Sequence, residues 1–288
     1  MPSKIPLFRA RQRTVLAVAS LSLTLLATGC AQPAGNTPAQ EPAGTAVFSH
    51  IHGMSVDPDT QRILLATHEG LFDATSEIPR KIGPTIDLMG FASAGNEHYY
   101  ASGHPAPETG LPDPAGLIHS IDGGETWEPL SRQGESDFHA LTVTGGGIIG
   151  YDGALRVTGD MESWATIDTD LQPYNLAGTQ LAPVVLATTE QGVHRSTDGG
   201  ETWALPTGAP VLLLTAFANE ATAVGVAPDG AVQVSHDAGS TWQETGGTIT
   251  GQPAAITASE DGGQLRIWVA TTTGIEHSAD NGATFTRR

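Results

Sequence analysis

Short apolar runs recur along most of the chain, and each is followed, after a turn, by a glycine and a second strand-like stretch. No helical apolar period is long enough to compete with this pattern. It predicts pairs of consecutive β-strands joined by tight turns. The apolar runs lie at residues 63–67, 99–102, 148–151, 184–188, 223–226 and 267–271, before Gly70, Gly116, Gly153, Gly192, Gly230 and Gly274.

A second motif, Ser-x-Asp-x-Gly-x-Thr-aromatic, recurs about every forty residues in the same part of the chain. It is an Asp box, which predicts a hairpin turn: Ser and Asp hydrogen-bond the turn backbone, Gly takes a positive φ, and the aromatic ring packs beneath. A degenerate copy ends at Trp164 and carries Val157 and Gly159 in the Ser and Asp positions. The complete copies contribute Ser120, Asp122, Trp127, Ser196, Asp198, Trp203, Ser235, Asp237, Trp242, Ser278, Asp280 and Phe285.

Repeats of this length, rich in strands and glycine, predict an all-β fold of the β-propeller type. Six units fit between about residue 47 and the end of the chain, so we predict six blades. Seven is the alternative, if one more blade lies in an irregular stretch. We expect the Asp boxes between the third and fourth strands of most blades, with a structural role only, because they lack the alternating oxygen ligands of a calcium loop.

The N-terminal segment indicates export. Basic residues at positions 4, 9, 11 and 13 precede an apolar run over residues 15–27, which is too short for an ordinary membrane span and is typical of a secretory signal. Residues 27–30 resemble a bacterial lipobox, and Cys30 is the only cysteine of the chain. We therefore predict a lipoprotein signal peptide over residues 1–29, lipidation of Cys30, and a flexible tether over residues 30–46 that is rich in Pro and Ala.

The net charge of the chain limits the classes of partner that the exported protein can bind. Removal of the signal would leave nine basic against 31 acidic residues. A surface of this sign repels nucleic acid, so nucleic-acid binding is excluded as a function class. The expected location is extracytoplasmic, with the protein held at the bacterial cell membrane through the lipid on Cys30.

Three of the expected innermost strands begin in the same way. Each has a polar residue, one spacer, a His or Met, a small residue and then an apolar strand, at residues 50–56, 87–92 and 137–143. Side chains alternate along a strand, so the first and third positions of this arrangement share one side. We therefore expect His52, Met89 and His139 to be equivalent residues of three successive blades.

The loops after the second strands add similar residues at the same face. His68 and Glu69 follow the second strand of blade 1, His104 that of blade 2, and Tyr151 and Asp152 that of blade 3. The corresponding loops of blades 4 to 6, at residues 189–191, 228–229 and 272–273, contain no histidine. Ligand-type side chains are therefore expected on one half of one face.

Imidazole and thioether groups suit soft and borderline metal ions, and a methionine favours copper over zinc, calcium or magnesium. This set of residues predicts a copper-type site in which Asp87 or Asp137 orients an imidazole. The alternative is that Met89 packs between blades and the histidines are hydrogen-bonded channel residues. The candidate metal ligands are His52, Met89 and His139, with His68, His104 and His50 as further ligands.

The Asp boxes make the chain similar to the sialidase-like and BNR-repeat propellers. Together with the lipobox, the motifs at residues 50–53, 89–91, 103–105 and 137–141 resemble a family of bacterial lipoproteins that carries a glycosylhydrolase label. The resemblance covers about residues 47–288 and implies a propeller. The label also implies a glycosidase, but a repeat that builds a scaffold does not establish a reaction.

A glycosidase site would need a specific set of side chains. The resemblance to sialidases implies three arginines that bind a carboxylate, yet none of the arginines after the signal lies in the Arg-Ile-Pro context of that family. Another glycosidase would need two carboxylates that flank a sugar bond. The catalytic candidates at the expected channel face are Glu69, Asp87, Asp137 and Asp152, with Tyr151 as a platform for stacking on sugar.

A third class of function is a scaffold without chemistry, in which the loops bind a protein or a cell-envelope polymer. The longest loop of the expected channel face, residues 104–116, contains four prolines that suit a rigid binding edge. The sequence therefore predicts an anchored extracytoplasmic propeller that binds a ligand at its channel mouth, with a copper-type metal site as the first hypothesis. A glycosidase that is not a sialidase and a binding scaffold are the alternatives.

Overall fold

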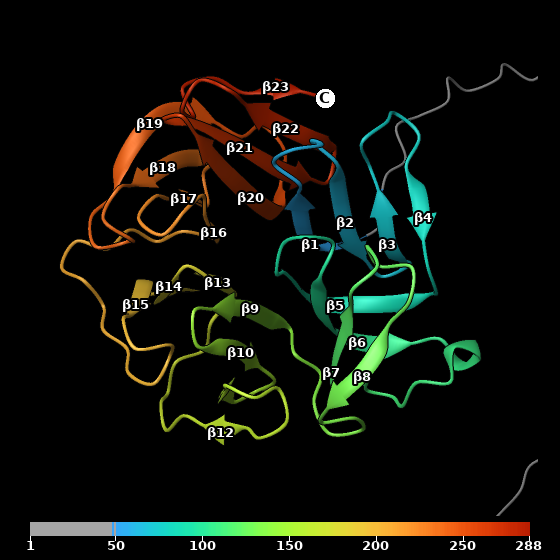
Figure 1. The fold of residues 1–288 in the computed structure, drawn as a ribbon. Coiled ribbons are helices and arrows are strands. Elements are labelled where there is room, and N and C mark those ends of the chain that lie inside the picture. Colours follow the sequence, from blue (N-terminus) through green and yellow to red (C-terminus); the bar gives the residue numbers. More distant parts are fainter. Residues whose placement is uncertain (1–47, 49) are drawn as a thin grey trace, which may run out of the picture. The chain divides into compact units, whose positions relative to one another are not determined.

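The computed structural model describes Phe48 and residues 50–288. The expected signal peptide, Cys30 and the whole of the expected tether lie outside the described residues. Within residues 50–288 the chain forms six antiparallel sheets arranged around a common centre, in chain order from blue to red in Figure 1. The innermost strands β1, β5, β9, β13, β16 and β20 each contact the next, and β20 contacts β1.

This arrangement confirms the all-β propeller with six blades. Five sheets have four strands, and the sheet of blade 4 has three, with its fourth strand reduced to a bridge between Arg195 and Ala204. A single short 3-10 helix, η1 (Pro107–Thr109), occurs in the described part of the chain. The strands of blades 1 to 3 are β1 (Ile51–Val56), β2 (Ile63–Thr67), β3 (Gly70–Asp73), β4 (Arg80–Ile82), β5 (Ile86–Ser93), β6 (Tyr99–Pro105), β7 (Leu117–Ser120), β8 (Glu128–Ser131), β9 (Ala140–Thr144), β10 (Gly147–Tyr151), β11 (Leu155–Thr158) and β12 (Ala165–Thr166). Those of blades 4 to 6 are β13 (Asn175–Thr179), β14 (Ala182–Thr189), β15 (Gly192–Ser196), β16 (Leu214–Phe217), β17 (Ala223–Val226), β18 (Ala231–Ser235), β19 (Gln243–Thr248), β20 (Pro253–Asp261), β21 (Gln264–Thr271), β22 (Gly274–Ser278) and β23 (Thr286–Arg287).

Apolar side chains fill the spaces between neighbouring blades. Six buried clusters each combine residues of two consecutive blades, which is why the second strands are apolar on both faces. The cluster that closes the ring joins Met54 and Ile63 of blade 1 to Trp268 of blade 6, whose side chain is 1% exposed. Burial of a side chain such as Ile63 contributes about 1.5–3 kcal/mol relative to leaving it in water.

The four complete Asp boxes form the turns between the third and fourth strands, as expected. In the box of blade 4, the Ser196 hydroxyl donates to Asp198 Oδ1 at 2.7 Å and accepts from the Gly200 N–H at 2.8 Å. Gly200 has φ +93°, and a Cβ there would lie 2.4 Å from the Ile149 side chain of the preceding blade. The glycine is therefore needed both for the turn and for close packing between blades.

The degenerate box of blade 3 corrects the alignment made from the sequence. Thr158 and Asp160, not Val157 and Gly159, take the Ser and Asp roles. The Thr158 hydroxyl donates to Asp160 Oδ1 at 3.1 Å, and the Ser163 N–H donates to the same oxygen at 2.7 Å. The turn is one residue shorter than the other boxes, so counting back from the aromatic residue shifts the register by one.

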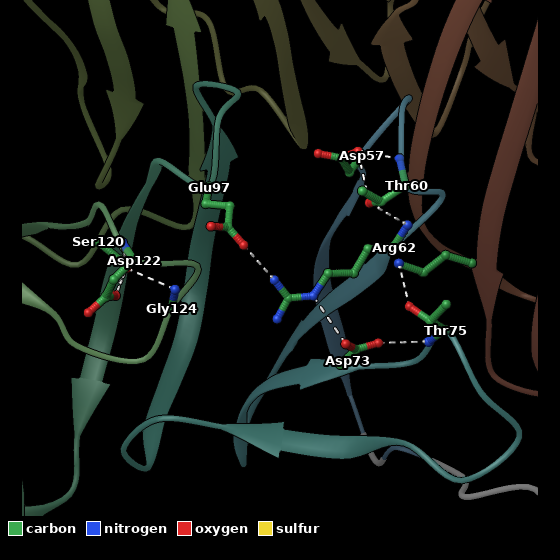
Figure 2. A network of polar contacts seen from close by, with 10 residues as sticks. Asp57, Thr60, Arg62, Asp73, Thr75, Glu97, Ser120, Asp122 and Gly124 are labelled. Carbon is green, nitrogen blue, oxygen red and sulfur yellow. Dashed lines mark hydrogen bonds and ion pairs between the residues drawn. The ribbon is translucent and has the colours of Figure 1, made fainter.

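Blade 1 has no Asp box, and an ion-pair network lies at the corresponding edge (Figure 2). Arg62 Nε contacts Asp73 Oδ2 at 3.1 Å within blade 1, and Arg62 Nη1 contacts Glu97 Oε1 of blade 2 at 3.0 Å. Figure 2 also shows the first complete box, in which the Gly124 N–H points at Ser120. Arg62 therefore links the first two blades on the side of the molecule that carries the boxes.

Candidate functional site

The channel mouth lies at the face opposite the Asp boxes. Because neighbouring strands run antiparallel, each innermost strand begins, and each second strand ends, at this face, whereas the boxes follow the third strands at the other. The central cavity has a volume of about 1100 Å³. His52, Met89 and His139 all line it, one from each of blades 1, 2 and 3.

His52 and Met89 occupy corresponding irregular positions. The pairing register shifts between Ile51 and Gly53 in β1, and in the same way between Leu88 and Gly90 in β5. A bulge residue is unpaired and its side chain is re-aimed, a device that is common beside functional sites. His139 lies directly before β9 and donates its backbone N–H to Tyr151 O at 3.0 Å, the carbonyl of the residue that pairs with Ala140, so it holds the corresponding position in blade 3.

His50, His52, His68 and Asp87 form one group, the blade 1–2 cluster. His68 Nδ1 lies 2.6 Å from Asp87 Oδ2, and His68 Nε2 lies 2.6 Å from His50 Nδ1. His52 Nε2 lies 3.9 Å from Asp87 Oδ1, beyond hydrogen-bond distance. One ligand atom from each of His52, His68 and Asp87 fits within 4.8 Å of the other two, the only group of three or more His, Cys, Asp or Glu residues that does so among the described residues.

Two atoms of this cluster are buried without a partner. His52 Nε2 and Asp87 Oδ1 are each inaccessible to water and make no hydrogen bond. Burial and the neighbouring His68 lower the pKa of His52, against the opposing effect of Asp87. His52 is therefore neutral near pH 7, the state in which an imidazole nitrogen can bind a metal ion.

His104, Asp113, Asp137 and His139 form a second group, the blade 2–3 cluster. His104 Nδ1 lies 2.6 Å from Asp113 Oδ1, and His104 Nε2 lies 3.2 Å from Asp137 Oδ2. His139 Nε2 contacts the same Asp137 oxygen at 2.7 Å. The hydrogen bond to Asp113 and the charge of Asp137 raise the pKa of His104 against its partial burial.

The candidate residues for a glycosidase differ in their contacts and in their exposure to solvent. Asp152 accepts from the Ser136 hydroxyl and forms an ion pair with Arg156 at 2.8 Å, and these contacts lower its pKa although burial opposes them. Tyr151 is half-buried and lines the cavity, whereas Glu69 is exposed. Asp87 and Asp137 each contact an imidazole rather than another carboxylate.

Sequence reasoning missed two residues of the mouth. Asp113, in the proline-rich loop after β6, contacts His104, and the only signal for it is a carboxylate within that loop. Tyr174, directly before β13, lines the cavity and is 67% exposed. It occupies the start of the innermost strand of blade 4, where the sequence lacks the motif of the first three blades, so no alignment pointed to it.

The chain matches the BNR/Asp-box repeat family over residues 194–205, which is the box of blade 4. The described residues form a β-propeller whose turns include Asp boxes. No curated protein sequence matches the chain. No helix in the described part of the chain has both the length and the apolar character needed to cross a membrane.

Solved structures of low sequence identity share the fold of this Asp-box propeller. A structure of YCF48 bound to a D1 peptide aligns at a TM-score of 0.50 and 16% identity, covering 85% of this chain and 83% of that one. An ancestral GH74 enzyme aligns at 0.50 and 17%, covering 85% of this chain and 39% of the enzyme. U3-55K aligns at 0.52 and 11%, covering 83% and 80%. These similarities establish the fold alone, since one scaffold serves many functions.

Proposed function

We propose that this protein is a lipid-anchored extracytoplasmic β-propeller whose channel mouth binds a transition-metal ion of the copper type. The observation that carries the proposal is the pair of buried, unpartnered atoms His52 Nε2 and Asp87 Oδ1, which lie 3.9 Å apart. A buried polar atom without a partner costs about 1–3 kcal/mol, so such atoms call for an explanation. An ion between them would satisfy both.

The geometry suits an ion better than a hydrogen bond. Bonds from a metal to imidazole and carboxylate ligands are about 2.0–2.2 Å long, so two ligands of one ion lie roughly 3–4 Å apart. The separation of His52 Nε2 from Asp87 Oδ1 falls in this range, and His68 supplies a third ligand-type group close to both. His50, in contact with His68, is available as a fourth ligand or as the group that orients His68.

Met89 favours copper over zinc. Its side chain lines the same cavity as His52, from the bulge of the neighbouring blade, and is half-buried. Thioether ligands select Cu(I), whereas zinc sites use imidazole, thiolate and carboxylate groups. The excess of acidic over basic residues in the chain also favours the approach of cations to the molecule.

The test is metal retention by matched double variants. Full-length protein is purified in detergent and dialysed with Cu(II), then with metal-free buffer, and bound copper is measured by elemental analysis. We expect His52→Ala with His68→Ala to lose the ion bound at the blade 1–2 cluster, because two of the three convergent ligands are gone. The control is His194→Ala with His236→Ala, which removes two histidines near the Asp box of blade 4 and within that of blade 5.

Retention of an undiminished amount of copper by the mouth variant, or a wild-type protein that retains none, would refute the metal proposal. Circular dichroism of each variant shows whether it is folded, so that unfolding is not mistaken for loss of ligands. A folded wild-type protein without metal would instead favour a binding scaffold. YCF48 bound to a D1 peptide is an example of that role in another protein of similar fold.

The surroundings of Asp152 weigh against a glycosidase. A general acid needs a raised pKa, but the contacts with Ser136 and Arg156 lower the pKa of this carboxyl. Asp152 therefore serves to hold the chain around blade 3. A panel of glycosides that yields no product with the wild-type protein is the outcome we expect.

A further inference from the structure

We infer that the ion at the blade 1–2 cluster binds an aromatic molecule with phenolic oxygen donors, a ligand of the catechol type, and that the ring of this ligand packs against Tyr174 of blade 4. The inference rests on the proposed function, because the ion supplies one of the two contacts. It deepens that function by naming a class of organic ligand and a residue that selects it.

Tyr174 holds the same position in blade 4 as the metal-type residues hold in the first three blades. It donates its backbone N–H to Thr188 O at 2.9 Å, as His139 of blade 3 donates to Tyr151 O at 3.0 Å. In both blades the donor directly precedes the innermost strand and faces the end of the second strand. Tyr174 therefore belongs to the same ring of side chains around the mouth as His52.

The two halves of the cavity differ in charge. Among the described residues, blades 4 to 6 contribute no histidine, methionine or charged residue to its lining. The carboxylates of the lining are Glu135, Asp137 and Asp152, all in blade 3 or in the loop before it. A ligand that reaches from one half to the other thus needs a metal donor at one end and a neutral surface at the other.

The lining also limits the kind of donor group. None of its described residues is a lysine or an arginine, so a ligand that arrives as an anion has no cationic partner there except the ion itself. Such a ligand would also meet the carboxylate of Asp137, whose contacts are with imidazoles. A phenol is neutral near pH 7, because its pKa is about 10, and its oxygen loses the proton on binding a metal ion. A phenolic donor therefore suits this cavity better than a carboxylate or a phosphate.

Tyr174 offers an aromatic face to the neutral end of the ligand. It is 67% exposed although it lines the cavity, whereas Tyr99 and Tyr100 are 5% and 7% exposed. Aromatic rings stack on one another in offset or edge-to-face arrangements, and such contacts contribute beyond the area that they bury. An exposed ring at the edge of a cavity is therefore a suitable platform for a second ring.

The width of the mouth fits a ligand of one ring. Blades 1 and 4 lie opposite each other in the ring of six sheets (Figure 1). Packed sheets are about 10 Å apart, so opposite innermost strands of a six-sided ring are roughly 20 Å apart. The side chains of His52 and Tyr174, together with the ion, fill most of this width and leave roughly 5–8 Å. One aromatic ring with its oxygen donors spans such a gap.

The blade 1–2 cluster leaves room for this donor on the ion. It supplies three convergent ligand groups, from His52, His68 and Asp87. A metal site with three protein ligands keeps a position for water or an added ligand, and the long, weak bond typical of a methionine does not fill it. His52 and Met89 line the cavity, so the ion is approached from the channel side.

The first experiment compares probe molecules. Full-length protein loaded with Cu(II) is titrated with catechol in the absence of oxygen, and binding is followed by calorimetry and by the electron paramagnetic resonance of Cu(II). We expect catechol to change the hyperfine lines and to bind metal-free protein at least tenfold more weakly. Cyclohexane-1,2-diol, which lacks the aromatic ring, and benzoate, which carries a carboxylate, should also bind at least tenfold more weakly than catechol. Copper that stays with the protein on gel filtration shows that catechol does not remove the ion.

The second experiment changes the aromatic platform. Tyr174→Ala should weaken catechol binding by about two- to tenfold, the range expected for the loss of ring packing, and leave the copper content unchanged. Tyr174→Phe keeps the ring and should bind catechol as the wild type does. The control is Leu181→Ala, which changes a residue of the same blade that is 68% exposed and lines the opposite end of the cavity. It should leave catechol binding unaltered.

The outcomes separate this inference from the proposed function. Copper-loaded wild-type protein that does not bind catechol, or that binds cyclohexane-1,2-diol or benzoate equally well, overturns the inference and leaves the metal proposal standing. Equal affinities of Tyr174→Ala and the wild type for catechol overturn it as well. If Tyr174→Ala fails to fold, the comparison of probe molecules on the wild-type protein still decides. A wild-type protein that retains no copper refutes the proposed function itself.

Discussion

Replacement of Ser196 by alanine isolates the contribution of one Asp box to the stability of the propeller. Ser196 is 1% exposed, and its hydroxyl donates to Asp198 Oδ1 at 2.7 Å and accepts from the Gly200 N–H at 2.8 Å. Its removal leaves the buried N–H of Gly200 without a partner, which costs about 1–3 kcal/mol. The charge-assisted bond to Asp198 is lost as well, so we expect a decrease of about 2–3 kcal/mol in the free energy of unfolding.

The assay is urea unfolding followed by tryptophan fluorescence, with differential scanning calorimetry beside it. For a domain of this size, a loss of about 2 kcal/mol lowers the melting temperature by about 4–8 °C. Thr197→Ala changes an exposed residue of the same turn and should alter stability by less than about 0.5 kcal/mol. Equal stabilities of Ser196→Ala and Thr197→Ala would show that the box hydroxyl has no special role and would refute the reasoning.

Three further predictions concern the mouth, the blade interface and the boxes. Met89→Leu should weaken Cu(I) binding at least tenfold and leave Zn(II) binding unchanged, measured by competition with a chromophoric chelator; equal losses for both ions would argue against a thioether ligand. Gly90→Ala should lower the free energy of unfolding in urea by about 1–3 kcal/mol, because a Cβ at position 90 in blade 2 would lie 2.3 Å from Phe138 O in blade 3. An unchanged free energy of unfolding would mean that blades 2 and 3 move apart at little cost. Hydrogen bonds from threonine hydroxyl and backbone groups lower the pKa of Asp198 and of Asp237 to about 2, so their contribution to stability is present above about pH 4 and should be lost as the pH falls toward 2. Calorimetry between pH 5 and 2 measures this, and a melting temperature that does not fall over that range would contradict it.

The fold was predictable because its signals are local and repeated. A Ser, an Asp and a Gly at fixed spacing define one turn, and six apolar runs define six second strands that the structure places between neighbouring blades. The register of the box in blade 3 was not predictable by counting back from Trp164, because the shorter turn moves Thr158 and Asp160 into the bonding positions. The fourth strand of blade 4, reduced to one bridge at Arg195, has no sequence signal of its own.

The sequence predicted that His52, Met89 and His139 lie at one cavity, but it did not predict the contacts between side chains of neighbouring blades. Alternation along the innermost strands brings His52 and Met89 to one cavity, yet the bulges that aim them there depend on close packing at Gly53 and Gly90. Contacts between blades, such as that of His68 with Asp87, depend on how far one sheet rotates against the next. That rotation is a property of the tertiary structure, and it cannot be predicted from the spacing of residues in the sequence.

The central claim is that the mouth of this propeller is a metal centre, and diffraction from copper-loaded crystals tests it most directly. Data collected at the copper absorption edge should show an anomalous peak within bonding distance of His52 Nε2 and Asp87 Oδ1. Well-ordered crystals with copper present and no anomalous peak at the mouth, or with peaks only at surface histidines such as His236, would contradict the account.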